Sequence, residues 1–511
     1  MISTSRAPRR ATPQELDQAV RRFITTAKQP VLEEPGDEPF PLDPDRYSFE
    51  PAATHLVVTV WDDQRNLTRR AISIENERPG RLKLTIERFG GKLGSITLYD
   101  AARPTNLALP LHGRRLVFRE QFRMMLKREM PGWKLETLTS EIDLQHTLSP
   151  KFPRALLHQG TNAWAAVASP PDCGEPDEIL TYGLIWLDYV RRREPKLTVQ
   201  GLLIFLPADQ AKVTALRLQW LDPAKAVYQL FIFNQTFSVQ LADLTDWGNL
   251  LSRLDICRRP LEETQSPISS LVEQTLALDG VEGIESGSGT MSLRVNGLEF
   301  GVFAGGQFDF GLDHKRPAAN HHWDEIRQTV EILRQLRHAD SQDKQNRIYT
   351  RQPERWLESG VRKSLPQIEP WFHASPVYGQ VPTFSGPDRG IIDLLAADRH
   401  GRLTVMELKA SEDPNLPLQA LDYWIRVNWH ATRGEFSPLG YFPGIPLRRE
   451  SPALMLIAPA LEFHPTTETL LRFFSSKVRV ERLGLALEWR QGVRVLFRLS
   501  GSSSASIGET T

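Results

Sequence analysis

The sequence is poor in the residues that mark secreted or membrane proteins. Only two cysteines, Cys173 and Cys257, occur in 511 residues, far apart and without metal-ligand spacing. This excludes a disulfide framework and predicts a reducing compartment. No run of about 18 apolar residues occurs, so no membrane span is predicted. The arginine-containing start, residues 1–10, has no apolar segment typical of a secretory signal. We therefore expect a cytoplasmic protein with no membrane partner.

The chain also lacks net charge. It has 62 Lys and Arg residues and 62 Asp and Glu residues, and its isoelectric point is about 7.2. A chain of this balance is not a general binder of polyanions, so any nucleic-acid contact must come from local clusters. Its length is sufficient for two to four domains with sizeable cores.

One stretch, Gly390–Ser411, concentrates chemically active residues. Two apolar runs, 391–397 and 403–408, flank a polar segment with the Asp and Gly chemistry of a turn, which predicts a β-hairpin. If the turn is centred on His400, Asp393 lies opposite Glu407. Directly paired residues on antiparallel strands have Cβ atoms about 4.5–5.5 Å apart.

The hairpin predicts one polar and one apolar face. Lys409 is two residues beyond Glu407 and therefore projects from the same face as the two acids. The opposite face carries only apolar residues, which we expect to pack on a core: Ile392, Leu394, Met406 and Leu408. The polar face therefore gathers two carboxylates and one ammonium group at the end of a strand pair.

Two carboxylates this close repel each other unless a cation lies between them. Mg²⁺ fits such a site because it is a hard ion that takes one or two carboxylates and completes its shell with water and phosphate oxygens. The chemistry that fits is hydrolysis of a phosphodiester, in which Lys409 orients the attacking water or offsets charge on phosphorus. The alternative is a surface hairpin with an ordinary Glu/Lys pair.

The sequence around the hairpin resembles a known nuclease superfamily. The PD-(D/E)XK signature is resembled by Asp393 followed, after thirteen residues, by Glu407-Leu408-Lys409. The sequence of the whole stretch is similar to that of NucS-type endonuclease domains. Pro387-Asp388 is nearer the literal signature, but its offset from Glu407 makes Asp393 the better match. A predicted helix, 416–430, follows the hairpin.

Further residues of the resemblance lie on predicted helices. Gln419 and Tyr423 stand one turn apart and match the Q-x-x-x-Y element of RecB-like domains. Upstream, Glu354 begins an E-x-x-L helix pattern that donates another acid in similar nucleases, with Glu358 as its substitute one turn later.

The resemblance implies a role for each of these residues. The metal, Mg²⁺ or Mn²⁺, would be held by Asp393, Glu407, the Leu408 carbonyl and Glu354. Lys409 would assist the water, and Gln419 and Tyr423 would order the site. The implied fold is a restriction-endonuclease-like mixed sheet flanked by helices.

We predict an α/β multidomain chain in which β-rich and α/β lobes precede the nuclease-like domain. The expected parts are a disordered leader with one helix (1–50), a β-rich lobe (51–112), an α/β lobe (113–260), a linker with a hairpin and a helix (261–345), the nuclease-like domain (346–500) and a disordered tail (501–511). Two short segments, 213–220 and 486–489, are predicted as strands. The phenylalanines of the 291–311 hairpin favour buried packing over base stacking.

An internal comparison suggests a repeat. Segments 164–169, 186–192 and 201–207 run parallel to 406–411, 420–426 and 453–459, and Leu-Asp-Tyr occurs in both helices. The hypothesis is a degenerate copy of the nuclease fold, with Ala165 and Val167 at the positions of Glu407 and Lys409. Convergent α/β patterning is the simpler account.

Two functions fit these observations. The first is a metal-dependent nuclease that hydrolyses DNA phosphodiester bonds in repair or genome defence, with the N-terminal lobes choosing a substrate, a protein partner or a second copy of the chain. The second is a catalytically weak scaffold that keeps the fold to bind nucleic acid or protein. The intact set Asp393, Glu407 and Lys409 favours the first.

Overall fold

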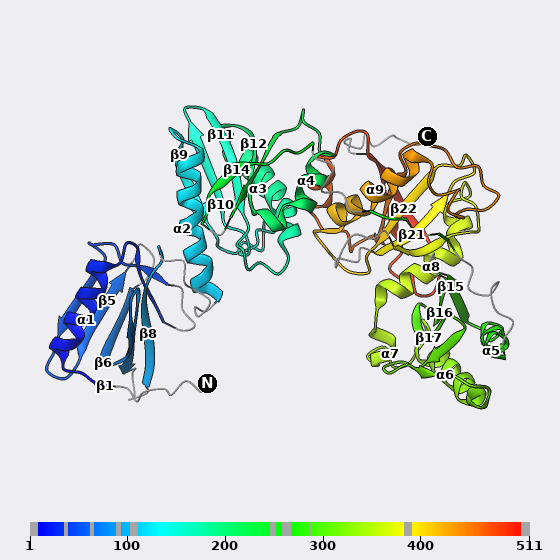
Figure 1. Ribbon diagram of the computed structural model, residues 1–511, viewed down its shortest axis with the longest axis horizontal. Helices are drawn as coiled ribbons and strands as arrows, with labels where there is room; N and C mark the ends of the chain where they lie inside the picture. Colours follow the sequence, from blue (N-terminus) through cyan, green and yellow to red (C-terminus); the bar gives the residue numbers. More distant parts are fainter. Residues whose placement is uncertain are drawn as a thin grey trace. The chain divides into compact units, whose positions relative to one another are not determined.

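The computed structural model shows an α/β chain with several sheets (Figure 1). It describes residues 9–34, 39–61, 66–87, 93–102, 111–234, 236–245, 252–254, 256–257, 267–285, 289–382 and 391–501. The chain divides into two compact units, which are described separately. The first unit holds residues 1–144, 148–174 and 233–239, and the second holds 145–147, 175–232 and 240–511.

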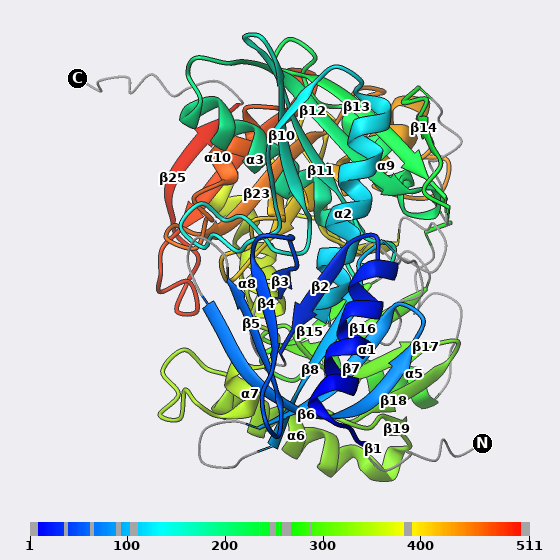
Figure 2. The ribbon, with the colours of Figure 1, turned by 90° about the vertical axis from the view of Figure 1, so that its left-hand side faces the viewer.

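The first unit begins with a sheet in the order β3-β2-β8-β7-β6-β5-β4, with β1 paired to β6. Burial alternates along β5 and β7, as expected for strands with one face on a core. Helix α1 lies across this sheet (Figure 2). The elements are β1 Arg9–Arg10, α1 Pro13–Thr26, β2 Pro30–Glu33, β3 Phe40–Pro41, β4 Tyr47–Pro51, β5 Leu56–Trp61, β6 Asn66–Arg78, β7 Arg81–Glu87 and β8 Leu93–Asp100.

The prediction of a disordered leader is wrong for the described residues before position 51. Helix α1 starts with a capping box between Thr12 and Glu15 and buries Leu16 and Phe23 in the core of this sheet. Phe40 is buried in the same core, although it follows a Pro- and Glu-rich run. Composition averaged over this region concealed the apolar residues that have partners in the sheet. Residues 35–38 lie outside the described ranges.

The first unit also contains a helix and an antiparallel three-stranded series. Strand β10 pairs with both β9 and β11. The elements are α2 Leu111–Glu129, β9 Lys134–Thr139, β10 Arg154–Gln159 and β11 Asn162–Ala168.

The second unit continues the α/β pattern. The strand expected at 213–220 is wrong, because this segment forms helix α4. The buried residues of α4 are Thr214, Ala215, Arg217 and Leu218, and this spacing of three and four is helical rather than alternating. The elements are α3 Ile179–Arg193, β12 Thr198–Pro207, α4 Lys212–Leu218, β13 Val227–Phe233 and β14 Val239–Leu241.

A small module follows, built on an antiparallel sheet in the order β15-β16-β17-β18-β19. Phe300, Phe303, Phe308 and Phe310 are buried in its core, which confirms packing rather than exposure for stacking. The elements are α5 Pro267–Leu276, β15 Val281–Glu285, β16 Thr290–Val295, β17 Leu298–Ala304, β18 Gln307–Phe310, β19 Arg316–Pro317 and α6 Trp323–Leu336.

The C-terminal domain has a mixed sheet in the order β20-β21-β22-β23-β24-β25. Strands β22, β23 and β24 are parallel, and the other pairs are antiparallel. Helix α8 contacts β21 and β22, and α9 contacts β22 and β23. The elements are α7 Arg347–Thr350, α8 Pro353–Ile368, β20 Tyr378–Pro382, β21 Ile391–Ala397, β22 Leu403–Leu408, α9 Leu416–Arg433, β23 Ala453–Pro459, α10 Thr467–Leu471, β24 Arg479–Leu485 and β25 Val495–Ser500.

Two expectations for this domain have different outcomes. Leu394 pairs with Met406, which confirms the register centred on His400. The strand expected at 486–489 is instead a turn, in which the Trp489 N–H donates to the Ala486 carbonyl. Of the expected disordered tail, 501–511, residues 502–511 lie outside the described ranges. No helix among the described residues has the length and apolar character needed to cross a membrane.

Arg337 joins the small module to α8. Its fully buried guanidinium donates to the carbonyls of Asn296, Ile348, Arg351 and Gln352 at 2.6–3.0 Å. Burial lowers its pKa to about 10, so it stays protonated at neutral pH. The turn at Gly297 of the small module also packs closely against α8. A Cβ on Gly297 would lie only 1.9 Å from the Arg355 carbonyl oxygen. The start of α8 is therefore fixed by the module that precedes it.

We expect Arg337→Met to destabilise the second unit by roughly 3 kcal/mol, because it leaves several buried carbonyls without a donor. Urea unfolding followed by tryptophan fluorescence measures this, since the guanidinium lies 4.8 Å from the Trp356 ring centre. Arg334→Met on the same helix is the control, because its side chain is 39% exposed. Equal effects of the two substitutions would contradict the role of Arg337.

Candidate metal centre

The candidate site lies where β21 and β22 separate. Their ladder extends as far as Leu394 and Met406, and before this point β21 pairs with β20 alone, through Ile391 and Ile392. The Asp393 carboxylate enters the opening and accepts a hydrogen bond of 3.0 Å from the Leu408 N–H. The predicted juxtaposition of Asp393 with the end of β22 is therefore present.

Asp393 and Glu407 oppose each other electrostatically. Burial, together with the charge of Glu358, raises the pKa of Asp393 to about 6 against the pull of the Leu408 N–H. Glu407 is 2% exposed, and burial and then Asp393 raise its pKa well above the ordinary value. Its Oε2 atom is buried without a hydrogen-bond partner. An unpartnered carboxylate oxygen beside a second carboxylate is a place that favours a cation.

Lys409 supplies one positive charge beside the acids. Its ammonium lies 3.2 Å from the carboxylate of Asp413, four residues further along the chain. Burial acts against its charge, but Asp413 and then Glu407 outweigh burial and raise the pKa of Lys409. The side chain is therefore a protonated donor at neutral pH and not a base.

Helix α9 contributes the two residues expected from the Q-x-x-x-Y element. Gln419 donates to the Tyr423 hydroxyl at 3.3 Å. Burial, followed by the charge of Glu407, raises the pKa of Tyr423. The phenol is thus neutral and close enough to Glu407 to interact with its charge, as the sequence predicted.

Helix α8 approaches the site through a different glutamate from the one favoured by sequence. Glu358 is 2% exposed and acts on the charge of Asp393, whereas Glu354 is partly exposed on the first turn. Both oxygens of Glu358 are occupied: Oε1 accepts from Arg362 at 2.9 Å and Oε2 from Arg355 at 2.8 Å. Glu358 is therefore engaged by arginines on both oxygens, whereas the role expected for Glu354 stays a prediction.

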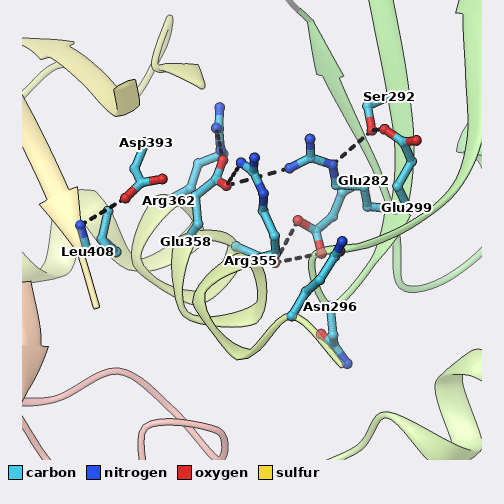
Figure 3. A network of polar contacts seen from close by, with 12 residues as sticks. Glu282, Ser292, Asn296, Glu299, Arg355, Glu358, Arg362, Asp393 and Leu408 are labelled. Carbon is cyan, nitrogen blue, oxygen red and sulfur yellow. Dashed lines mark hydrogen bonds and ion pairs between the residues drawn. The ribbon is translucent and has the colours of Figure 1, made fainter. Parts of the chain in front are cut away.

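The Glu358 cluster connects the small module to the site (Figure 3). Arg294 of β16 lies 3.6 Å from Glu358, and Ser359 of α8 donates to Glu282 of β15 at 2.6 Å. Gly379 of β20 leaves room for the cluster, because a Cβ there would lie 2.0 Å from an Arg362 nitrogen. The cluster thus holds Glu358, whose charge acts on Asp393, in place between arginines of two parts of the chain.

The residues present fit a single Mg²⁺ or Mn²⁺ ion bound by a small number of protein ligands. The groups that could serve as its donors are Asp393, the unpartnered oxygen of Glu407 and the Leu408 carbonyl, since in an extended strand the carbonyl faces the same side as its own N–H. Mg²⁺ commonly uses one or two carboxylates and keeps several waters. No group of three or more His, Cys, Asp or Glu side chains suited to a metal is found in the described part of the chain.

Sequence reasoning missed the charged surroundings of the site. Arg294, Arg355 and Arg362 converge on Glu358, and Asp413 holds Lys409. The spacing of Arg355, Glu358 and Arg362 at three and four residues was a usable signal, because such residues share a helix face. Nothing in the sequence indicated Arg294. Pro387-Asp388 lies outside the described residues.

Comparison with known proteins does not assign a family: no family model, curated protein or solved structure matches the chain.

We expect Asp393→Asn to stabilise the protein at pH 8 by roughly 2–3 kcal/mol in the absence of metal. The pKa of Asp393 is raised from 3.8 to about 6, so its ionisation costs stability that is lost progressively as pH rises from 4 to 6. The variant removes this charge, and the gain should vanish near pH 4.

Urea unfolding from pH 4 to 8, in EDTA, measures this gain. Asp340→Asn is the control, because its side chain is 76% exposed. A variant no more stable than wild type at pH 8, or a gain that persists unchanged at pH 4, would contradict the assignment.

Proposed function

We propose that the C-terminal domain is a PD-(D/E)XK-type, restriction-endonuclease-like nuclease that hydrolyses DNA phosphodiester bonds with Mg²⁺ or Mn²⁺. The observation that carries the proposal is the buried, unpartnered oxygen of Glu407 next to Asp393, where β21 and β22 separate. Folding gains nothing from such a pair in the absence of a cation. The mixed sheet with α8 and α9 against β22 supports the same assignment.

The chain's own residues suggest a division of labour. Asp393, Glu407 and the Leu408 carbonyl would hold the metal, which would supply polarisation of a phosphoryl oxygen and a lowered pKa of a water. Lys409, kept protonated by Asp413 and Glu407, donates to the attacking water or to a phosphoryl oxygen. Tyr423, hydrogen-bonded to Gln419, limits the space beside Glu407. Arg355 of α8 is a positive group whose charge acts on both acids.

Metal binding is expected to stabilise the folded chain. At a Mg²⁺ concentration about ten times its dissociation constant, the wild type should gain roughly 1.4 kcal/mol. Glu407→Gln and Asp393→Asn should gain little, because each loses a ligand charge. Differential scanning calorimetry with Mg²⁺ against EDTA measures the shift, and Glu488→Gln, an exposed glutamate of the same domain, is the control. Equal shifts in all four proteins would place the metal elsewhere.

Glu407→Gln should reduce DNA cleavage by about 100-fold or more, since it removes a ligand charge from the metal. A supercoiled-plasmid assay with Mg²⁺, Mn²⁺ or EDTA measures this, with Glu488→Gln expected to cleave as wild type does. Equal cleavage by wild type and Glu407→Gln would overturn the proposal. Binding of DNA without any cleavage would favour the alternative of a nucleic-acid-binding scaffold.

A further inference from the structure

The order of elements in the C-terminal domain occurs twice in the chain. Strands β20, β21 and β22 form an antiparallel series, followed by α9, β23, α10, β24 and β25. Strands β9, β10 and β11 also form an antiparallel series, followed by α3, β12, α4, β13 and β14. The finding that 212–218 is a helix completes this match, because α4 takes the place of α10. Both α3 and α9 carry Leu-Asp-Tyr, and both β12 and β23 end on proline.

The first series lacks the chemistry of the second. Leu156 on β10 pairs with Ala165 on β11, at the positions that correspond to Asp393 and Glu407. Val167 corresponds to Lys409, and all three residues are buried. A strand pair with apolar side chains at these positions cannot hold a divalent cation. Residues 134–241 therefore have the order of elements of a nuclease domain without a metal site.

Within the second unit, the corresponding segments after α4 and α10 pair with each other. Leu218 ends α4 and Leu471 ends α10, so Leu221 and Phe474 occupy equivalent positions, and these two form an antiparallel bridge. The Asp222 N–H donates to the Phe473 carbonyl at 2.8 Å. The Ser475 N–H donates to the Trp220 carbonyl, also at 2.8 Å. By the same equivalence, Asp222 corresponds to Ser475 and Phe473 corresponds to Trp220. Exchanging the equivalent residues therefore converts the first hydrogen bond into the second, as a local two-fold axis requires.

The helix contacts beside the bridge are related by the same two-fold exchange of equivalent elements. Helix α4 contacts α9, and α10 contacts α3. The α4–α9 contact is closed by Arg217, which donates to both oxygens of Asp422 at 2.8 and 2.6 Å, and by Trp220 on Trp424 with ring centres 4.6 Å apart. The helix pairing and the backbone bridge therefore follow the exchange expected of an isologous contact between two copies of one chain, but here both sides belong to a single chain.

We infer that residues 134–241 are an inactive copy of the nuclease fold that takes the place of a dimer partner, so that one chain offers one metal centre and nicks one strand of duplex DNA. The inference rests on the proposed function. In the single step, a water oxygen bonds to phosphorus, the bond from phosphorus to one sugar oxygen breaks with its electron pair, and the proton lost by water balances the proton gained by the leaving oxygen. The other strand remains intact because Leu156, Ala165 and Val167 provide no site.

A plasmid time course tests the inference. With the full chain and Mg²⁺, open circles should accumulate to nearly all of the DNA before linear molecules appear, and the initial rate should be first order in protein. Linear DNA as a primary product, or a rate that rises with the square of protein concentration, would overturn the single-centre inference while leaving the nuclease intact. No cleavage with either metal would overturn both.

Cross-linking tests the pairing without any cleavage. Leu221→Cys and Phe474→Cys, made together in a chain with Cys173→Ser and Cys257→Ser, should form a disulfide on mild oxidation, because non-hydrogen-bonded antiparallel pairs have Cα atoms about 4.5 Å apart. An intrachain bond gives a faster-migrating single chain on a non-reducing gel. A band of twice the mass would show that the pairing occurs between chains and would overturn the inference, as would a folded variant that forms no bond. Each single-cysteine variant is the control.

Discussion

The repulsion between Asp393 and Glu407 is the constraint on which the C-terminal domain depends. Both carboxyls have raised pKa values, and Glu407 has a buried oxygen without a partner. A fold selected for stability alone would have an apolar pair here, as the Leu156 and Ala165 pair in the first series does. The domain tolerates the two acids because the opposite face of the β21–β22 hairpin packs into one hydrophobic core. In this core, Leu394, Met406 and Leu408 pack together with side chains of α8.

The surroundings of the acids explain how their geometry is kept. Asp393 is held by the Leu408 N–H, and Lys409 by Asp413, so neither charged group can move away freely. Behind them, Glu358 is fixed by three arginines, one of which comes from the preceding module. Arg337 fixes the start of the same helix through backbone carbonyls. The small module therefore acts as a support for the site, which the sequence alone presented as a linker.

The sequence predicted what depends on local pattern. The hairpin, its register and the face shared by Asp393 and Glu407 follow from alternation and turn chemistry within about twenty residues, and Gln419 and Tyr423 follow from helical spacing. It did not predict what depends on distant partners. Phe40 is buried in the core of the first sheet, although its neighbours in sequence are rich in Pro and Glu. Arg294 lies close to Glu358, although the two residues are 64 positions apart in sequence. The strand predicted at 213–220 is wrong because the buried residues of this segment follow the spacing of a helix.

The internal pairing changes how the whole chain is understood. In a two-fold dimer of identical nuclease domains, both partners carry a metal site, and two cuts follow from symmetry. Here the bridge between Leu221 and Phe474 keeps the symmetric contact, while the residues at the proposed metal positions differ between the two series. If the two series arose by the duplication that we infer, each could change independently, so one could lose its acids and keep its packing surface. The bridge and the asymmetric metal positions together favour a single centre more strongly than either observation does alone.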